Sequence, residues 1–490
     1  MEPGMAGAAD LLRHAREVFR DDAAALAVVD ELDSRLKGPL RIAVAGMVKA
    51  GKSTLLNAII GEEIAPTDAG ECTRVVTWYE YGHTPKITVY PFRGGPQNLP
   101  VTREDGRLVL SLGDIPAGDV ERLVVDWPSA GLRNLTLIDT PGIASMSEDI
   151  SGRSAAFLLP EDEPTAADAV IYLLRHLHAS DVRFLESFKD TAAGRSGTVN
   201  ALAVLSRADE IGAGRIDSLI SAAVIADRYS RDQNLRPLAL GVVPVAGLLA
   251  QSSRTMRQAD YEAMAMLAQM DRSQRERMML SADRFVRFEA PQGLRPATKA
   301  SLVQRFGLFG IRLGVALIRG GTADPTELAH ELARRSGLGT LLDAISYLFQ
   351  NRADALKARA VVVGLESLVR GVPRERTAPL EAALERLQAG AHEFRELKLL
   401  AALRTGGVGL DEEQEAEAER LVGGRGSTAS LRLGVNPEAD PRQISEAARS
   451  CLSRWRLIAE NPLTEPSALE ACRVVVRSCE GMLAAMPAVR

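Results

Sequence analysis

Residues 46–54 read GMVKAGKST, and they lie between an apolar run, Ile42–Ala45, and a segment with helical periodicity, Ser53–Ile60. The stretch matches G-x-x-x-x-G-K-[ST], a pattern in which the backbone N–H groups of a glycine-rich loop and the start of a helix bind phosphate groups together. A strand before the loop and a helix after it are the context that this pattern requires. The stretch therefore predicts a phosphate-binding loop in an α/β fold.

The polar residues of this loop have separate expected roles. Lys52 is expected to reach the β and γ phosphates of a nucleotide, and the Ser53 hydroxyl is expected to bind Mg²⁺. A glycine-rich turn that binds nothing is the alternative, which the flanking strand and helix disfavour. The nucleotide-binding candidates in this loop are Gly46, Lys49, Ala50, Gly51, Lys52, Ser53 and Thr54.

A second phosphate-associated motif follows in LTLIDTPGI, residues 135–143. Asp139 ends an apolar strand, where its carboxylate is expected to hold Mg²⁺ through water, and the Gly142 N–H is expected to contact the γ phosphate. DTPG alone also occurs as a plain turn. After a phosphate-binding loop it is typical of a GTPase switch.

The segment between these motifs, PTDAGECTRVVTW at residues 66–78, offers a threonine for the other switch. Thr73 lies in a loop before a strand, where a hydroxyl can bind Mg²⁺ and a backbone N–H can contact the γ phosphate. Thr67 is the competing candidate for this role. A plain threonine at the edge of a strand is the third interpretation.

Base recognition is expected after a later strand, in ALAVLSRADEIG at residues 201–212. The usual GTPase form is [NT]-K-x-D, in which the lysine stem lies over the purine and the aspartate accepts two hydrogen bonds from guanine. Here Asp209 is kept, whereas Ser206 and Arg207 replace the first two residues. An arginine can also stack on a ring, so guanine stays favoured. The next strand ends in VPVAG, and Val245–Gly247 are expected to lie against the base.

Four motifs in this order make the chain similar to dynamin-like GTPases, and especially to the bacterial ones. The resemblance rests on residues 46–61, 64–78, 135–142 and 336–360, the last of which resembles that family's passage from GTPase head to helical neck. More narrowly, LRIAVAGMVKAGKST, SRADEIGAGRID, RFGLFGIR and GVNP resemble the mycobacterial isoniazid-inducible members.

The resemblance implies ligands and partners that the residues alone do not. It implies GTP or GDP with Mg²⁺, and either self-association through the GTPase heads or pairing with a longer dynamin-like paralogue. It also implies peripheral contact with the inner face of the plasma membrane. The basic, glycine-rich GGRGSTASLR at residues 423–432 is the candidate for membrane contact through Arg425 and Arg432, with a solvated interhelical loop as the alternative.

The catalytic residues are expected to differ from those of small GTPases. Those proteins place a glutamine just after DTPG to orient water, whereas this chain has Ile143, Ala144 and Ser145. Resemblance to dynamins implies that Lys49 lies near the β/γ bridging oxygen, and that dimerisation of two heads completes the site. An exposed loop lysine is the alternative. The catalytic candidates are Lys49, Lys52 and Thr73.

The order of strand-like and helical segments predicts the architecture. Short β-rich runs from Leu40 to about Val245 predict a mainly parallel sheet, and residues 74–128 are expected to add antiparallel edge strands. From about Leu249 helical periodicity dominates, with helical stretches expected over 261–288, 326–336, 339–369, 379–403, 412–421, 441–458 and 467–486. We expect an N-terminal helix packing on the helical bundle over 1–37, a GTPase domain over 38–350 (motif core 40–250, helical extension 250–350), and a helical neck and stalk over 351–490.

Two apolar segments carry expectations of their own. Residues 7–36 show the period of one amphipathic helix. Residues 307–321, GLFGIRLGVALIRGG, are interrupted by Arg312 and Arg319, and are expected to form a buried or half-buried helix, with a membrane-touching segment as the alternative.

Composition limits the remaining function classes. The 490 residues are 25% charged and 46% hydrophobic, which is ordinary for a globular protein, and a net charge of −5 gives no basic field for nucleic acid. The N-terminus lacks the pattern of an export signal, so we expect a cytoplasmic protein whose four cysteines are reduced and mostly buried. The first hypothesis is a Mg²⁺-dependent GTPase, and the second is a slowly hydrolysing GTP-binding partner of a longer paralogue. An ATPase is disfavoured by Asp209 and DTPG.

Overall fold

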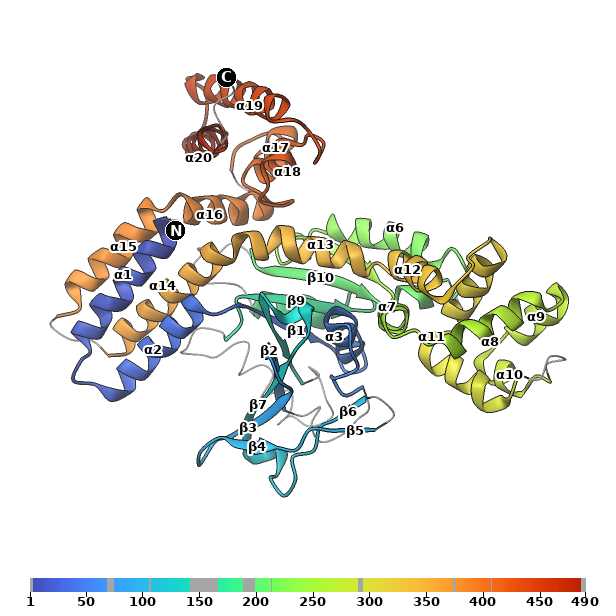
Figure 1. Cartoon of the computed structure of the whole chain (residues 1–490). Coiled ribbons are helices and arrows are strands. Elements are labelled where there is room, and N and C mark those ends of the chain that lie inside the picture. The colour runs from blue at the N-terminus through green and yellow to red at the C-terminus, as the bar shows by residue number, and fades with distance from the viewer. Residues whose placement is uncertain are drawn as a thin grey trace.

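The computed structural model describes residues 3–67, 75–104, 107–141, 166–187, 199–212, 214–289, 294–372, 376–406 and 408–485. A mixed sheet lies at the centre (Figure 1). The N-terminal helices and part of the C-terminal half form an arm on one side of it, and a lobe of helices extends on the other. The chain thus crosses the sheet region before it returns to its own N-terminus.

The centre of the sheet is parallel. The order in the nine-stranded sheet is β11-β10-β9-β1-β8-β2-β7-β3-β4, and its first five strands run parallel. Strands β9 and β10 are buried at every residue, as expected of central strands covered on both faces. These strands are β1 (Leu40–Gly46), β8 (Leu135–Asp139), β9 (Ala169–Leu174), β10 (Ala201–Ser206) and β11 (Val242–Val245).

The other side of the sheet contains the antiparallel pairings. Strand β2 runs antiparallel to β8 and parallel to β7, and β3 runs antiparallel to both β7 and β4. A separate antiparallel pair, β5–β6, was not predicted. The bounds are β2 (Val76–Tyr81), β3 (Lys86–Pro91), β4 (Gln97–Leu99), β5 (Thr102–Glu104), β6 (Arg107–Val109) and β7 (Val120–Trp127). The predicted mainly parallel sheet with antiparallel edge strands is confirmed.

Among the described residues of the head, four helices accompany the strands. Helix α3 follows the phosphate-binding loop directly and packs against α7. Helix α6 packs against β11 through its buried face. The bounds are α3 (Lys52–Ile60), α5 (Ala179–Ser187), α6 (Ser218–Ser230) and α7 (Gly247–Arg254).

The helical lobe divides more finely than its periodicity predicted. One helical stretch was expected over 261–288, but three helices form, because Asp271 and Ser281 each cap a new helix by accepting hydrogen bonds from backbone N–H groups. The lobe consists of α8 (Gln258–Gln269), α9 (Arg272–Met278), α10 (Ala282–Arg287), α11 (Pro296–Arg319) and α12 (Pro325–Arg335).

Helix α11 contains the apolar segment that the sequence singled out. By length and composition it is the one helix in the described ranges that could cross a membrane, and half of its most apolar window is buried inside the protein. Gly307 interrupts the helix with φ of 62°, and the Arg312 guanidinium donates to the carbonyls of Gly214 and Met279. The segment packs within the lobe as the predicted buried or half-buried helix.

The N-terminal segment forms two helices where one was predicted. Helices α1 (Pro3–Val18) and α2 (Ala23–Lys37) are separated by a turn, and the Asp22 side chain caps α2 by accepting a hydrogen bond from the Ala25 N–H. The two helices keep one apolar period because both pack against α14 (Ala353–Gly371), and α1 also packs against α15 (Ala378–Gly390). Asp22 was the sequence signal for the start of a second helix, and the continuous apolar period concealed it.

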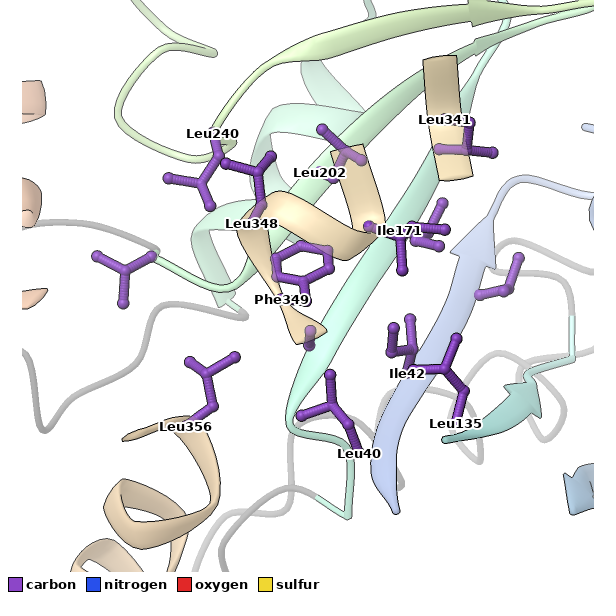
Figure 2. Packing of buried hydrophobic residues seen from close by; sticks show 14 of the residues in the cluster. Leu40, Ile42, Leu135, Ile171, Leu202, Leu240, Leu341, Leu348, Phe349 and Leu356 are labelled. Atoms are coloured by element: carbon purple, nitrogen blue, oxygen red, sulfur yellow. The ribbon is translucent and has the colours of Figure 1, made fainter. Parts of the chain in front are cut away.

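Helix α13 (Leu338–Leu348) joins the neck to the sheet. Figure 2 shows Leu341, Leu348 and Phe349 pointing toward Ile171 and Leu202 of the sheet, with Leu356 of α14 at the end of the same cluster. Burying side chains of this size stabilises the fold by roughly 1.5 to 3 kcal/mol each. The predicted single stretch 339–369 is therefore two helices that share one core.

The C-terminal bundle consists of α16 (His392–Thr405), α17 (Glu412–Leu421), α18 (Ala429–Leu433), α19 (Pro441–Glu460) and α20 (Pro466–Ala484). The predicted stretch 379–403 is two helices, α15 and α16, broken at Ala391, which has extended φ and ψ angles. Cys451, Cys472 and Cys479 are buried free thiols, as predicted, and Cys72 lies outside the described residues. The division into domains at 37 and 350 stays a prediction.

One predicted membrane contact is wrong in part. Arg425 is exposed, but the Arg432 side chain is only 14% exposed, because its guanidinium pairs with Glu396 and donates to the Leu421 carbonyl. Gly423 and Gly424 are also buried. Four of the ten residues of segment 423–432 are buried, four are half-buried, and only Arg425 and Thr428 are exposed.

Arg404 connects this bundle to the head. Its guanidinium, at the end of α16, donates to the carbonyls of Arg236 and Ala239 and pairs with Glu419 of α17. Arg236 pairs with the same carboxylate at 3.1 Å. Residues 236–239 lead into β11, so the bundle holds the segment that enters the edge strand of the sheet.

Candidate functional site

The phosphate-binding loop leaves β1 at a position that only glycine fits. Gly46 has φ of 146°, and a Cβ atom built there would lie 2.5 Å from the Leu173 carbonyl oxygen on the neighbouring strand β9. Gly51, at the N-cap of α3, has φ of 98°, in the left-handed region that favours glycine. The two glycines therefore set the path of the backbone at both ends of the loop.

Three polar side chains meet below this loop. The Lys52 ammonium donates to the Gly46 carbonyl at 3.2 Å, and the Ser53 hydroxyl donates to Oδ2 of Asp139 at 3.2 Å. Burial lowers the pKa of Lys52, and the charge of Asp139 partly offsets this effect. Burial raises the pKa of Asp139 to about 6, against the opposing effects of Lys52 and Ser53. The predicted cation, hydroxyl and carboxylate are thus brought together.

The same residues fit a magnesium ion. Oδ1 of Asp139 is buried and has no hydrogen-bond partner among the described residues, although a buried carboxylate oxygen without a partner is costly. Mg²⁺ prefers hard oxygen ligands, often one or two protein groups completed by water and phosphate. The Ser53 hydroxyl and the Asp139 carboxylate supply such oxygens side by side. Their metal-binding role stays a prediction.

The candidate base site is a cavity of about 160 Å³ beside the loop. It brings together residues from the phosphate-binding loop, from the SRAD segment and from the start of α7, as the motif order predicted. Burial raises the pKa of Asp209, whose carboxylate belongs to this cavity. The lining includes Ala50, Gly51, Thr54, Ser206, Arg207, Asp209, Val245, Gly247 and Leu248.

The two altered residues of the SRAD segment have structural partners. The Ser206 hydroxyl is buried and donates to the Leu174 carbonyl at 3.1 Å, which joins the ends of β10 and β9. Arg207 has a left-handed backbone and donates to the Lys49 carbonyl at 3.1 Å and to Glu210 at 2.7 Å. Arg207 is among the residues that line the cavity, and its guanidinium connects the SRAD segment to the phosphate-binding loop.

Lys49 is an exposed residue of the phosphate-binding loop, directly before Ala50 of the base cavity. Its φ is 63°, a conformation that costs a non-glycine residue roughly 1 to 3 kcal/mol, and its side chain is exposed. The hydrogen bond that its carbonyl accepts from Arg207 helps to hold this conformation. The position suits both the catalytic role and the alternative of an exposed loop lysine.

Two candidates cannot be placed. Thr73 and Gly142 lie outside the described residues, so their expected contacts with metal and phosphate stay predictions. The competing Thr67 is described and exposed.

Two residues that fix the site were missed. Asn57 is buried in α3 and holds the segment leading to Thr67, since it donates to the Ala65 carbonyl and accepts from the N–H groups of Ile64 and Ala65. An asparagine inside the apolar run TLLNAII was the available signal. The Thr140 hydroxyl, directly after Asp139, donates to the Val44 carbonyl at 3.0 Å and fixes the end of β8 against β1.

Comparison with known proteins agrees with this arrangement. The model of the dynamin family matches residues 42–192, which include the phosphate-binding loop and DTPG. The isoniazid-induced protein IniC of Mycobacterium tuberculosis (strain CDC 1551 / Oshkosh) is 41% identical over 462 residues, or 94% of this chain and 93% of that protein. The chain belongs to the dynamin family. The predicted resemblance to bacterial dynamin-like proteins, and to the isoniazid-inducible members in particular, is confirmed.

Other proteins resemble this dynamin-like chain over smaller parts or with lower similarity. The bacterial dynamin-like protein of Nostoc punctiforme (strain ATCC 29133 / PCC 73102) is 33% identical over 119 residues, 22% of this chain and 17% of that protein. A solved structure of an oligomerised bacterial dynamin pair, described in connection with long-range sensing and tethering of membranes, aligns with 98% of this chain and 74% of its own. The TM-score of that alignment is 0.33 and the identity 13%.

Proposed function

We propose that this dynamin-like protein binds and hydrolyses GTP with Mg²⁺ and couples its nucleotide state to movement of the helical neck and stalk at the cytoplasmic face of a membrane. The proposal rests on one observation. Lys52, Ser53 and Asp139 come together at the phosphate-binding loop, beside a cavity that is lined by Asp209. A bound Mg²⁺ would neutralise charge on the β and γ phosphates.

Each residue of the phosphate site has its own proposed role. Lys52 would bind β and γ phosphate oxygens in place of the Gly46 carbonyl, and the Ser53 hydroxyl and the Asp139 carboxylate would hold the Mg²⁺. Asp139 then acts as a carboxylate, which its raised pKa permits at neutral pH. The loop N–H groups from Lys49 to Thr54 hold the phosphates, with Thr73 and Gly142 as the proposed switch contacts.

Asp209 provides the preference for guanine. Its carboxylate accepts two hydrogen bonds from the guanine edge, while adenine presents no matching pair of donors. The desolvated position of Asp209 strengthens such bonds and penalises a ligand that leaves them unmade. The arrangement favours a GTPase over an ATPase.

Lys49 is the proposed catalytic cation. Because it is exposed in the phosphate-binding loop, its ammonium can move onto the bridging oxygen between the β and γ phosphates and stabilise charge on the leaving group. A second head bound across the nucleotide would shield this contact from water and complete the site.

Close packing between the base cavity and the neck supports coupling to movement. The Ala246 N–H, at the end of β11, donates to the Ser336 carbonyl at 2.9 Å, directly before α13. Gly337 has φ of 83°, and a Cβ atom there would collide with the Pro244 carbonyl. A shift of Val245–Gly247 on nucleotide binding is therefore passed directly to the start of α13.

A slowly hydrolysing regulatory partner of a longer paralogue is the second candidate. Ser206 and Arg207 favour it. The Ser206 hydroxyl donates to the Leu174 carbonyl, and the Arg207 guanidinium donates to the Lys49 carbonyl and pairs with Glu210. Both groups are thus occupied in the structure, which limits what they add to base binding.

Hydrolysis of GTP against protein concentration tests the proposal, with and without liposomes and with Lys52→Ala as the control. An enzyme of dynamin type gives a rate per molecule that rises with concentration or lipid. Tight GTP binding with a flat, negligible rate supports the regulatory partner. Absence of GTP binding by the unmodified chain refutes both.

A further inference from the structure

The helices at the outer end of the lobe carry an excess of basic side chains. Residues 272–319, which span α9, α10 and α11, contain ten arginines and lysines but three carboxylates, Glu276, Asp283 and Glu289, although the whole chain has a net charge of −5. Helices α9 and α10 lie at the end of the lobe that points away from the arm and the C-terminal bundle (Figure 1). An acidic protein thus extends a basic projection into solvent.

Half of these ten cations have partners that explain them. Four are buried or half-buried, and their side chains donate to backbone carbonyls or pair with a buried carboxylate inside the lobe. These four are Arg275, Lys299, Arg305 and Arg312. The fifth, Arg272, is exposed and pairs with Glu276 at 2.7 Å.

The other five are exposed arginines, and the described part of the chain offers none of them an ion pair. They are Arg277, Arg284, Arg287, Arg295 and Arg319. The exposed carboxylates of Asp283 and Glu289 lie in the same stretch and offset only part of this charge. By comparison, three exposed arginines of the C-terminal bundle each pair with a glutamate, namely Arg456, Arg473 and Arg477.

Two hydrogen bonds hold α10 along the side of α11. The Arg312 guanidinium donates to the carbonyl of Met279, just before α10, at 2.5 Å. The Lys299 ammonium donates to the carbonyl of Phe288, directly after α10, at 2.5 Å. Helix α10 therefore runs antiparallel to α11, and its ends are fixed at known positions along that helix.

Five exposed side chains lie on or beside α10. Arg284 and Arg287 are three residues apart and are neighbours on its surface. Arg295, the N-cap residue of α11, lies one turn before Lys299 and so near the end of α10. Arg277 is in the last turn of α9, and Leu280, in the turn between α9 and α10, is 66% exposed. We call Arg277, Leu280, Arg284, Arg287 and Arg295 the lobe edge.

We propose that the lobe edge binds the surface of a membrane that contains anionic lipid. The proposal rests on the proposed function, which places the chain at a membrane, and it names the surface that makes the contact. Four arginines without ion-pair partners are complementary in charge to lipid phosphates, and each adds to the attraction. Leu280 enters the boundary between headgroups and acyl chains, as apolar side chains of interfacial segments do.

The aliphatic character of the exposed side chains favours lipid over nucleic acid. Proteins that bind single strands without sequence preference stack the bases on aromatic side chains. The large apolar side chains that are exposed in the described part of the lobe are Met266 and Leu280, and neither is aromatic. An aliphatic side chain among arginines instead matches a membrane interface.

Co-sedimentation of the full chain with vesicles, without nucleotide, tests the contact. The unmodified chain is expected to bind vesicles of phosphatidylglycerol and phosphatidylcholine in equal parts, and not vesicles of phosphatidylcholine alone. Binding should weaken between about 0.1 M and about 0.5 M salt, because salt screens exposed charges. A chain that ignores the anionic vesicles, or binds both kinds equally, overturns the proposal.

Charge reversal locates the contact on the lobe edge. The variant with Arg277→Glu, Arg284→Glu and Arg287→Glu is expected to bind anionic vesicles at least about a hundredfold more weakly. The matched control carries Arg456→Glu, Arg473→Glu and Arg477→Glu, which change the net charge equally, and it should bind as the unmodified chain does. Equal losses in the two variants would mean that net charge alone decides binding, and this outcome overturns the lobe edge as the site.

A dye that reports a nonpolar environment tests the position of Leu280. Attached at Leu280→Cys, it should shift its emission to shorter wavelengths on anionic vesicles, whereas at Leu463→Cys, 89% exposed in the C-terminal bundle, it should not. The unmodified chain, labelled in the same way, gives the background from its own cysteines. A shift at Leu463 and none at Leu280 assigns the contact to the bundle and overturns the proposal.

A fluorescent single-stranded oligonucleotide tests the competing class of ligand. Oligonucleotide binding that the Arg277, Arg284 and Arg287 substitutions abolish, in a chain that ignores vesicles, assigns the lobe edge to nucleic acid and overturns the membrane contact. Vesicle binding without oligonucleotide binding supports it.

GTP affinity separates this proposal from the proposed function. The charge-reversal variants should bind GTP and melt as the unmodified chain does, because the substituted side chains are exposed and lie outside the residues that line the base cavity. If the unmodified chain binds vesicles through the lobe edge but binds no GTP, the proposed function fails and the contact stands. If it hydrolyses GTP but ignores anionic vesicles, the contact fails and nucleotide hydrolysis stands.

Discussion

Arg35 of α2 forms an ion pair at 2.6 Å with Asp168, which lies directly before β9, although 133 residues separate them in the chain. Both side chains are buried, 5% and 0% exposed. Asp168 also accepts a hydrogen bond from the Arg41 N–H at 2.8 Å. A single carboxylate thus holds the N-terminal helices against the start of β1 and β9, the two strands that lead into the site.

Removing that carboxylate should destabilise the protein strongly. Asp168→Ala removes the carboxylate that pairs with a buried guanidinium and with the Arg41 N–H, and we expect a loss of about 3 to 5 kcal/mol in the free energy of unfolding. Thermal or urea unfolding measures it. The control is Asp10→Ala, whose pair with Arg13 is 67% and 73% exposed and should matter little. Equal melting points for the two variants would contradict the structural role of the pair.

Titration of Asp139 should make the stability of the nucleotide-free protein and its Mg²⁺-dependent GTP binding change in opposite directions with pH. Because its pKa in the folded state, about 6, exceeds its ordinary 3.8, folding favours the protonated form, and free-protein stability falls as pH rises through that window. The difference corresponds to on the order of 2 to 3 kcal/mol at pH 7. Asp139→Asn should therefore stabilise the nucleotide-free protein at pH 7, measured by urea unfolding.

Magnesium-dependent GTP binding should instead improve as pH rises. The metal requires the carboxylate form of Asp139, so its apparent affinity is expected to fall about tenfold per pH unit below pH 6 and to level off above it. Titration of Mg²⁺ against a fluorescent GTP analogue checks this. A profile that is flat from pH 5 to 8, or one that Asp139→Asn leaves unaltered, would falsify the assignment.

Gly46→Ala should abolish nucleotide binding through a steric clash. The new Cβ atom would lie 2.5 Å from the Leu173 carbonyl oxygen, and the φ of 146° is unfavourable for alanine. We expect a loss of at least a hundredfold in GTP affinity, measured by equilibrium binding. Gly339→Ala is the control, since nothing lies near its Cβ position in α13 and alanine favours a helix by up to about 1 kcal/mol.

Lys49→Ala should lower turnover much more than GTP affinity. The ammonium is exposed in the free protein and is expected to engage the bridging oxygen chiefly as charge develops there, which gives a loss of roughly 100-fold in kcat. Single-turnover hydrolysis and equilibrium binding separate the two quantities. Equal losses in both would mean that Lys49 only helps to hold the nucleotide.

The sequence alone predicted the centre of the fold closely. The apolar runs at residues 40–46, 135–139, 169–174 and 201–206 are strands over those same residues, because short continuous apolar runs are typical of parallel strands that are buried on both faces. It did less well with helices. Asp22, Asp271 and Ser281 cap new helices inside apolar patterns that read as continuous, since capping depends on a local turn that periodicity does not detect.

The order and spacing of the motifs determined which residues form the candidate site, and the tertiary structure decided which groups these residues contact. The order of the phosphate loop, DTPG and SRAD predicted that Lys52, Ser53, Asp139 and Asp209 gather at one edge of the sheet, because parallel strands place their carboxyl ends together. The spacing of motifs in the sequence did not reveal that Arg207 donates to the Lys49 carbonyl, or that Arg432 pairs with Glu396 inside the bundle. Such contacts join segments far apart in the chain, and only the packing of strands and helices fixes which groups come within hydrogen-bonding distance.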